Sequence, residues 1–212
     1  MKNAVRNVVF DFGGVLVRWR PLEIIESFYP DGPLRERVRG MVFEHPDWVE
    51  MDRGALSDAA AVERFAARLE RPEAEIHLLL QHVRDSLTPL PETVAILRGL
   101  KDRGVPLYGL SNMAASTFAH LRERYSFWDS FLGIVISADI KLVKPDPRIF
   151  DHLCERYGLA PAETLFIDDH RPNIESARRC GFHTIHFSDA ERCREQIESH
   201  LSARDHAGRD GA

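Results

Sequence analysis

Short apolar runs alternate with amphipathic segments along the second half of the chain. The amphipathic segments carry apolar residues every three or four positions, as helices with one buried face do, whereas the runs have the length of strands buried on both faces. The pattern predicts strands at residues 105–110, 133–137, 164–167 and 184–187, and helices near 94–100, 114–125, 147–157, 172–180 and 190–201. This alternation predicts an α/β fold, in which a doubly wound parallel sheet is covered by helices on both faces.

The beginning of the chain departs from this alternation. Residues 8–10 predict another buried strand, but the next strand begins only near Val105, a gap much longer than one crossover helix needs. Within the gap, residues 21–87 carry apolar side chains at helical spacing. We therefore expect a core of residues 1–17 and 89–201, interrupted by a helical unit at 18–88. The polar residues 202–212 lack apolar periodicity and are expected to form a disordered tail.

Reactive polar side chains stand at the ends of the predicted strands. In chain order they are Asp11, the pair Ser111 and Asn112, Lys144, and the pair Asp168 and Asp169. The carboxyl ends of strands in an open parallel sheet face the crevice where such sheets bind ligands. Gly13 and Gly14, which follow Asp11, let backbone N–H groups approach an anion closely. Carboxylates, an ammonium, a hydroxyl and an amide at one such edge indicate phosphoryl transfer.

The three acidic residues predict a metal site. Asp11, Asp168 and Asp169 would repel one another in one crevice unless a cation lay among them. Hard carboxylate oxygens without thiolate or imidazole partners favour Mg²⁺. The backbone carbonyl of Gly13 can supply a further oxygen. Because Mg²⁺ takes few carboxylates directly, one of Asp168 and Asp169 is expected to act through water or to orient the other ligands.

The same residues predict a covalent reaction. Asp11 can attack phosphorus in line and form an aspartyl phosphate that water later hydrolyses. Lys144 would keep that carboxylate ionised and neutralise charge that develops on the transferring group. Ser111 and Asn112 precede a predicted helix, so a phosphate is expected to bind to their side chains and N–H groups, together with those of Gly13 and Gly14.

This order of strand-end residues resembles the haloacid dehalogenase-like hydrolase superfamily, from about Val8 to about Ser188. Lys144 begins the sequence Lys-Pro-Asp-Pro, followed by Ile-Phe, which matches the third motif of the family. The acidic pair at 168–169, followed by Asn173, matches the fourth. The resemblance implies a Rossmann-like core, a helical cap at 18–88 that closes over the crevice, and Mg²⁺-dependent hydrolysis of a small phosphomonoester.

Gly13 departs from the family's pattern. Most phosphatases that the chain resembles carry a second aspartate at this position, which protonates the leaving group and then activates water. General acid–base help of this kind is worth roughly 10²–10⁴-fold in rate. Another proton carrier, for which His170 is a candidate, or a good leaving group would compensate. The chain resembles bacterial members with glycine at this place, some of which act on glucose 1-phosphate, so a sugar phosphate is the expected substrate.

Gly13 is also compatible with a dehalogenase or with a binding protein. In 2-haloacid dehalogenases of the family the nucleophilic aspartate attacks carbon, no metal is needed, and the second aspartate is also missing. Asp168 and Asp169 favour a phosphatase, because buried carboxylates without a cation would cost several kcal/mol. A catalytically weak protein would bind a phosphorylated ligand or a partner, and the retained Asp11 and Lys144 argue against it.

Four residues of the insertion are candidates for substrate specificity, namely Arg18, Trp19, His45 and Trp48. Arg18 and Trp19 lie where the chain leaves the core, so the arginine can pair with an anionic group and the tryptophan can stack on a sugar. The alternative roles are structural: a solvent-facing hinge at Arg18, a wedge between domains at Trp19, and a core position at Trp48.

Composition narrows the possible partners. The 212 residues have a net charge of −5 and no long basic run, so nucleic acid is not an expected partner. Apolar runs are short and broken by charges, so neither a membrane span nor a signal peptide is expected. Three scattered cysteines fit a cytoplasmic protein with reduced thiols. The expected partner is a small-molecule phosphate ester, and the sequence predicts no oligomeric state.

Overall fold

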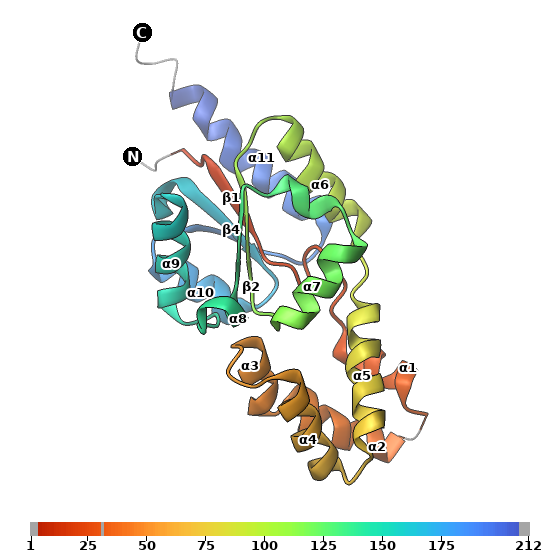
Figure 1. The fold of residues 1–212 in the computed structure, drawn as a ribbon. Coiled ribbons are helices and arrows are strands. Elements are labelled where there is room, and N and C mark those ends of the chain that lie inside the picture. Colours follow the sequence, from red (N-terminus) through yellow and green to blue (C-terminus); the bar gives the residue numbers. More distant parts are fainter. Residues whose placement is uncertain (1–3, 31, 208–212) are drawn as a thin grey trace.

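The computed structural model describes residues 4–30 and 32–207. Its centre is a five-stranded, all-parallel sheet with the strand order β3-β2-β1-β4-β5 (Figure 1). The strands are β1 (Asn7–Phe10), β2 (Leu107–Ser111), β3 (Gly133–Ile136), β4 (Thr164–Asp168) and β5 (His183–His186). Because β1 pairs with both β2 and β4, the strand that ends at Asp11 lies in the middle of the sheet. The predicted α/β class with a doubly wound parallel sheet is confirmed.

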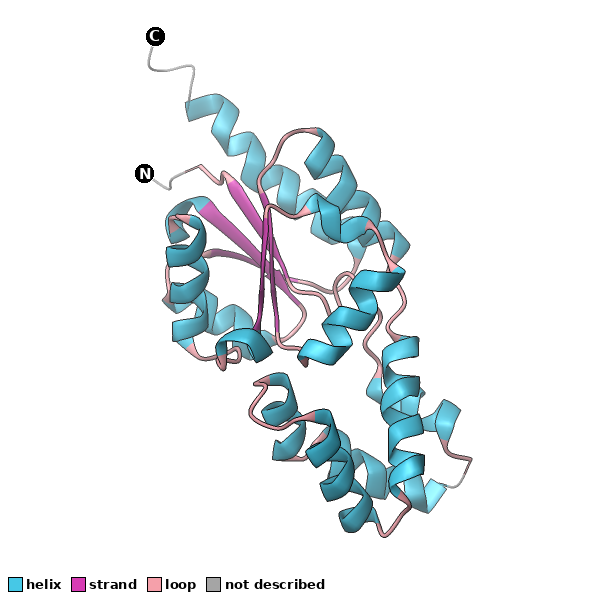
Figure 2. Ribbon diagram, in the orientation of Figure 1, coloured by secondary structure: helices cyan, strands magenta, loops and turns pink. Residues whose placement is uncertain are grey.

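Helices account for most of the remaining chain (Figure 2). The helices of the sheet region are α6 (Pro91–Asp102), α7 (Ala115–Arg124), α8 (Ser137–Ile140), α9 (Pro147–Tyr157), α10 (Arg171–Arg179) and α11 (Ala190–Ala207), with 3₁₀ turns at Phe127–Ser130 and Pro161–Glu163. Between β1 and α6 lie α1 (Pro21–Phe28), α2 (Gly32–Val38), a π-helical turn (Arg39–Phe43), α3 (Pro46–Asp52), α4 (Asp58–Leu69) and α5 (Glu73–Ser86).

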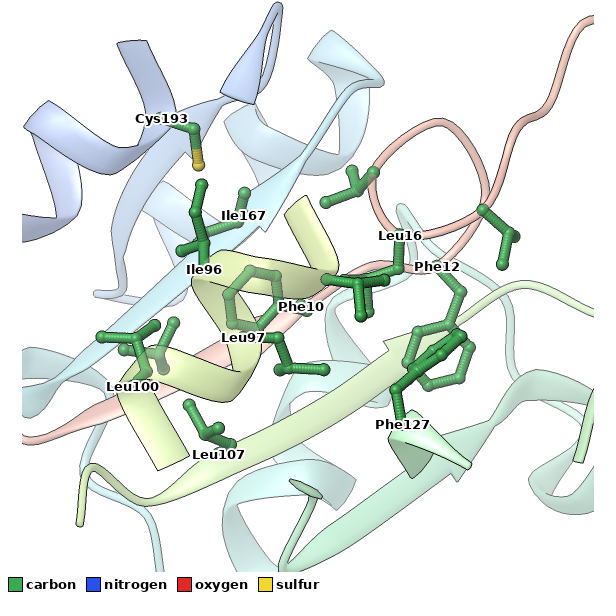
Figure 3. Close-up of a cluster of buried hydrophobic side chains, with 14 of the residues drawn as sticks. Phe10, Phe12, Leu16, Ile96, Leu97, Leu100, Leu107, Phe127, Ile167 and Cys193 are labelled. Atoms are coloured by element: carbon green, nitrogen blue, oxygen red, sulfur yellow. The ribbon is translucent and has the colours of Figure 1, made fainter. Parts of the chain in front are cut away.

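The sheet has an apolar layer on each face. Successive residues of a strand point to opposite faces, so Phe10 packs in the layer with α6 and α11, whereas Val9 packs in the layer with α9 and α10. Figure 3 shows the first layer, where Phe10 lies near Leu97 and Ile167. Burial of each such side chain contributes about 1.5–3 kcal/mol. Two full layers therefore hold the carboxyl ends of the strands in fixed relative positions.

The inserted helices have a hydrophobic core of their own. Its buried members all come from residues 25–80, with Phe65 and Leu69 among the completely buried ones. Asp47, at the start of α3, joins two helices of this unit through contacts with Arg64 and Arg68 of α4. In Figure 1 the insertion lies below the carboxyl ends of the strands, on the opposite side from both chain termini.

The two connections between the sheet region and the insertion run side by side. Val17 and Pro89 form an isolated bridge, and the backbone N–H of Arg18 donates to the carbonyl of Thr88 at 2.7 Å. The chain thus enters and leaves the insertion at one place, as it does at many domain boundaries. We propose on this basis that residues 18–88 form a separate cap domain.

The predicted tail is wrong over its first half. Helix α11 extends to Ala207, so residues 202–207 are helical although they lack an apolar period. Adding residues to a helix that has already formed costs little, and Ala and Arg are good helix formers. A helix can therefore continue beyond its last buried residue. Residues 208–212, the remainder of that prediction, lie outside the described residues. Within the described chain, no helix combines the length and apolarity required to cross a membrane.

Candidate active site

Asp11 begins a tight loop at the carboxyl end of β1. Its backbone N–H donates to the carbonyl of Ile167 on the neighbouring strand at 2.9 Å, which fixes it beside the end of β4. The N–H of Phe12 donates to Oδ1 of Asp11 at 2.6 Å. The loop then closes on itself, since the N–H groups of Leu16 and Val17 both donate to the carbonyl of Phe12. The carboxyl group of Asp11 is thus oriented by the backbone around it.

Lys144 contacts Asp11 and is almost completely buried. Its ammonium Nζ lies 2.9 Å from Oδ1 of Asp11, 2.7 Å from Oδ2 of Asp168 and 2.9 Å from the carbonyl oxygen of Leu110. Burial works against the charged form of Lys144, but Asp11 and Asp168 together raise its pKa above the ordinary value. The two carboxylates therefore favour the charged form of the ammonium, which has three oxygen partners.

Asp168 is tied into this network and has no exposed surface. Its Oδ1 accepts from the backbone N–H of His170 at 2.7 Å, and the Nδ2 of Asn173 lies within hydrogen-bond distance of both carboxylate oxygens. Burial acts to raise the pKa of Asp168, yet Lys144 and these donors hold it below the ordinary value. These contacts favour the ionised form of Asp168 and let it orient Lys144 and Asn173.

Asp169 is the exposed member of the acidic group. A Cβ built on Gly14, whose φ is +74°, would lie 2.1 Å from Oδ2 of Asp169, so the carboxylate rests directly against the glycine backbone. One oxygen each from Asp11, Asp168 and Asp169 lies within 4.8 Å of the others. Loss of hydration in the crevice, and then the charge of Asp168, raise the pKa of Asp169, and burial raises the pKa of Asp11. One ammonium does not offset three carboxylates, so the site favours a cation.

The loop after β2 brings Ser111 and Asn112 to the same place. Ser111 is buried and lines the cavity in front of Asp11. Asn112 also lines it, but its amide is engaged with the backbone of Lys144: Nδ2 donates to the carbonyl at 2.9 Å, and Oδ1 accepts from the N–H at 2.8 Å. The Asn112 side chain therefore positions the lysine, a role that the sequence did not indicate.

The cavity in front of these residues has a volume of about 620 Å³ and lies between the sheet region and the insertion. Its polar end is formed by Asp11, Ser111 and Asp169. The insertion also supplies Arg39, Glu44 and Asp52, but most of its lining residues are apolar, namely Trp19, Pro21, Leu22, Phe43, Trp48, Val49, Val83 and Leu87. Such a cavity can hold a charged group at one end and an apolar group at the other.

Three aromatic rings form one surface of the apolar wall that the insertion contributes. The rings of Phe43 and Trp48 are stacked with centroids 4.7 Å apart, and the ring of Trp19 stacks on that of Trp48 at 5.8 Å. Nothing in the sequence singled out Phe43, which falls in the π-helical turn. Leu22 and Val49, at the edge of the cavity, are among the large apolar side chains that remain exposed.

Two candidates for specificity lie elsewhere. The Nδ1 of His45 accepts from the N–H of Asp47 at 3.1 Å and caps α3, and His45 is not among the described residues that line the cavity. Arg18 lies 3.6 Å from Glu23 and lines a neighbouring cavity of about 420 Å³, which Gly14, Trp19 and Asp169 also line.

Comparison with known proteins adds independent observations. A family model described as haloacid dehalogenase-like hydrolase matches residues 5–181. The sesquiterpene phosphatase astK of Aspergillus oryzae is 28% identical over 90% of this chain and 93% of its own. The (S)-2-haloacid dehalogenase 1 of a Pseudomonas strain is 26% identical over 89% of this chain and 78% of its own.

The solved structures show the same fold. A HAD family enzyme of Bacteroides thetaiotaomicron, solved as an aspartate-to-alanine mutant with magnesium and inorganic phosphate, aligns with a TM-score of 0.72 and 21% identity. The alignment covers 87% of this chain and 94% of that one. At this identity the likeness concerns the fold.

Proposed function

Because this chain belongs to the haloacid dehalogenase-like hydrolase family, we propose that it is a Mg²⁺-dependent phosphatase that uses Asp11 as a nucleophile on a phosphomonoester with an apolar organic group. The family model spans most of the chain, so the resemblance inferred from the strand-end motifs is confirmed. The chain is a hydrolase, and its phosphatase relatives support an activity on phosphate esters.

One observation carries the proposed chemistry: three carboxylates converge beside the cavity, and two of them, those of Asp11 and Asp168, contact one buried ammonium. Asp11 is oriented toward the cavity by its own loop and by Lys144, as an attacking group must be. Lys144 opposes the effect of burial on the pKa of Asp11 and so favours the ionised form of the attacking carboxylate, and it can offset charge on the phosphate oxygens. Ser111, which lines the cavity beside Asp11, offers a hydroxyl donor to the phosphate.

The residues present fit a magnesium ion. Asp11 and Asp169 present carboxylates to the cavity, and the backbone carbonyl of Gly13 lies in the same loop. Lys144 and Asn173 engage Asp168, so we assign it a supporting role next to the direct ligands. When bound, Mg²⁺ would neutralise the excess negative charge and polarise a phosphate oxygen. A neighbour of the same fold holds magnesium and inorganic phosphate, which supports this choice of ion.

The apolar wall supports the choice of substrate. A sugar carries hydroxyl groups that need hydrogen-bond partners, and burying them without partners costs free energy. The rings of Trp19, Phe43 and Trp48 instead suit a flat or chain-like apolar group. The relative astK is a phosphatase named for a sesquiterpene, which is such a group. An apolar phosphomonoester therefore fits this cavity better than the sugar phosphate expected from the sequence.

A dehalogenase is the second candidate, because (S)-2-haloacid dehalogenase 1 aligns over most of the chain. An attack on carbon would use the same Asp11 and Lys144. It would leave the exposed Asp169 without a role, whereas a metal site uses it. The acidic cluster therefore favours the phosphatase.

The test is a comparison of substrates with and without the metal. We expect release of phosphate from a prenyl monophosphate in the presence of Mg²⁺, loss of that activity with EDTA, and its recovery when Mg²⁺ is restored. A hexose phosphate should give a lower kcat/KM. Halide release from 2-chloropropionate that is insensitive to EDTA, with no phosphatase activity, would instead establish the dehalogenase.

A further inference from the structure

The reaction proposed above leaves one chemical need unmet, and the inference that follows rests on that proposed function. When the bond between phosphorus and the leaving oxygen breaks, that oxygen must receive a proton unless it belongs to a very good leaving group. Gly13 occupies the position where a proton donor is expected and has no titratable group. The donor must therefore come from another residue that lines the cavity.

Asp52 is a carboxylic acid that the chemistry described so far does not use. It ends helix α3 of the insertion and lines the same cavity as Asp11 and Asp169. Asp11 approaches phosphorus from the sheet side, so in an in-line displacement the leaving oxygen points away from it. The insertion, which carries Asp52, forms that opposite side of the cavity.

The position of Asp52 is fixed by contacts with the sheet region. The backbone N–H of Ala114, just after the loop that carries Ser111, faces the carboxyl group of Asp52 and acts to lower its pKa. Ser137 Oγ donates to the backbone carbonyl of Asp52 and accepts from the N–H of Met113 at 2.9 Å. One serine therefore joins the loop after β2 to the residue on the insertion.

The residues after Asp52 are clamped to the same part of the sheet region. The ammonium of Lys141 donates to the carbonyl of Gly54 at 2.5 Å. Gly54 has φ +69°, and a Cβ built there would lie 2.5 Å from the carbonyl oxygen of Ala138, so the two backbones are in close contact. The segment that carries Asp52 is thus held against helix α8, and Asp52 lines the cavity from there.

We propose that Asp52 is the general acid and base of the phosphatase reaction. In the first step an oxygen of Asp11 bonds to phosphorus, the bond to the leaving oxygen breaks with its electron pair on that oxygen, and the proton of Asp52 moves to it. In the second step water attacks the aspartyl phosphate and gives a proton to the Asp52 carboxylate. Phosphate leaves, and Asp11 is restored.

The acidity of Asp52 suits this role. Burial raises its pKa to about 7, so near neutral pH both its proton-donating and its proton-accepting forms are populated. The charged and titratable groups that line the same cavity are Asp11, Arg39, Glu44, Asp169 and His170. His170, the candidate from the sequence, is exposed on the loop after β4 and faces the cavity from the sheet side.

The experiment compares two esters of similar shape, 4-nitrophenyl phosphate and 2-phenylethyl phosphate, with Mg²⁺ present. Nitrophenolate leaves without a proton, whereas phenylethanol needs one. We expect Asp52→Asn to lower kcat/KM for the phenylethyl ester roughly 10²–10⁴-fold and to leave the nitrophenyl ester within about tenfold of the unaltered protein. Asp52→Ser, which also lacks a titratable group, should behave like Asp52→Asn. Asp52→Glu keeps a carboxyl group and should keep much of the activity on the phenylethyl ester.

Two control variants and the unaltered protein separate the possible outcomes. Glu63→Gln, at an exposed site on α4, should leave kcat/KM for both esters unchanged. Equal losses on both esters with the Asp52 variants, or no loss, would overturn the proposal, and so would a leaving-group-dependent loss confined to His170→Gln. If the unaltered protein hydrolyses neither ester, the proposed function fails. If it hydrolyses both and the Asp52 variants show no dependence on the leaving group, only the assignment of Asp52 fails.

Discussion

The amide of Asn112 brackets the backbone of Lys144, donating to its carbonyl and accepting from its N–H. The backbone of the lysine that faces Asp11 is therefore positioned by a residue on another loop. We expect Asn112→Ala to leave these two backbone groups without their partner, lowering the free energy of unfolding by about 1–3 kcal/mol and reducing kcat. Urea denaturation and turnover measure this. Gln81→Ala, at an exposed site on α5, should change stability by no more than about 0.5 kcal/mol.

Asp11 is the proposed nucleophile, and Asp11→Asn retains its shape without its charge. We expect turnover of phosphate esters to fall by roughly 10³-fold or more, since removal of a nucleophile has effects of that order. Asp102→Asn, at an exposed site on α6, should retain full activity. An Asp11→Asn protein that still turns over at the normal rate, with no deamidation visible by mass spectrometry, would rule out the covalent route.

The two glycines after Asp11 predict opposite outcomes. Gly14 has φ +74° and lies against the carboxylate of Asp169, so Gly14→Ala should displace that carboxylate and strongly reduce both activity and Mg²⁺ affinity. A Cβ on Gly13 would meet only the side chain of Trp19, at 3.6 Å, an ordinary contact. Gly13→Ala should therefore fold normally and bind Mg²⁺ as before. Titration of activity with Mg²⁺ compares the two, and similar curves for both variants would contradict the proposed role of Asp169.

The aromatic wall predicts how affinity depends on the substrate. Trp48→Ala removes the ring that stacks on Trp19 and Phe43. Because loss of a buried aromatic contact costs about 1.5–3 kcal/mol, KM for a prenyl monophosphate should rise about tenfold or more. The KM for acetyl phosphate, which is too small to reach this wall, should change little. Equal increases for both substrates would indicate a general disturbance of the cavity.

Asp47 predicts a pH dependence of stability. Hydrogen bonds from Arg68 lower its pKa, and those from Arg64 add to the effect. A carboxyl group whose pKa is lower in the folded state stabilises the protein above its unfolded pKa, about 3.9, and this contribution is lost as the pH falls through the lower folded value. We therefore expect Asp47→Asn to destabilise the protein at pH 7, with a difference from the unaltered protein that shrinks below about pH 4. A difference that is constant with pH would contradict this ionic role.

Local patterns in the sequence were sufficient for the architecture of this protein. Apolar runs and helical spacing predicted the strands and most of the helices, because burial imposes a period on each element that can be read without its neighbours. The polar residues at strand ends were predictable for a related reason. Parallel strands bring their carboxyl ends to one edge, so Asp11, Lys144 and the acidic pair had to lie close together.

Contacts between elements far apart in the chain were decided only by the tertiary structure. The sequence assigned Asn112 to phosphate, whereas its amide is engaged by the backbone of Lys144; it also left Phe43 unnoticed, which packs on Trp48 across a helical turn. Asp52 was not among the site residues predicted from the sequence, and its place in the cavity depends on Ser137 and Ala114 of the sheet region. A periodic pattern records which face of an element is buried, but the partner on that face depends on how the elements pack. The sequence alone therefore indicated that three carboxylates and a lysine lie together at one edge of the sheet, whereas packing of the insertion against the sheet decided the shape of the cavity and which residues line it.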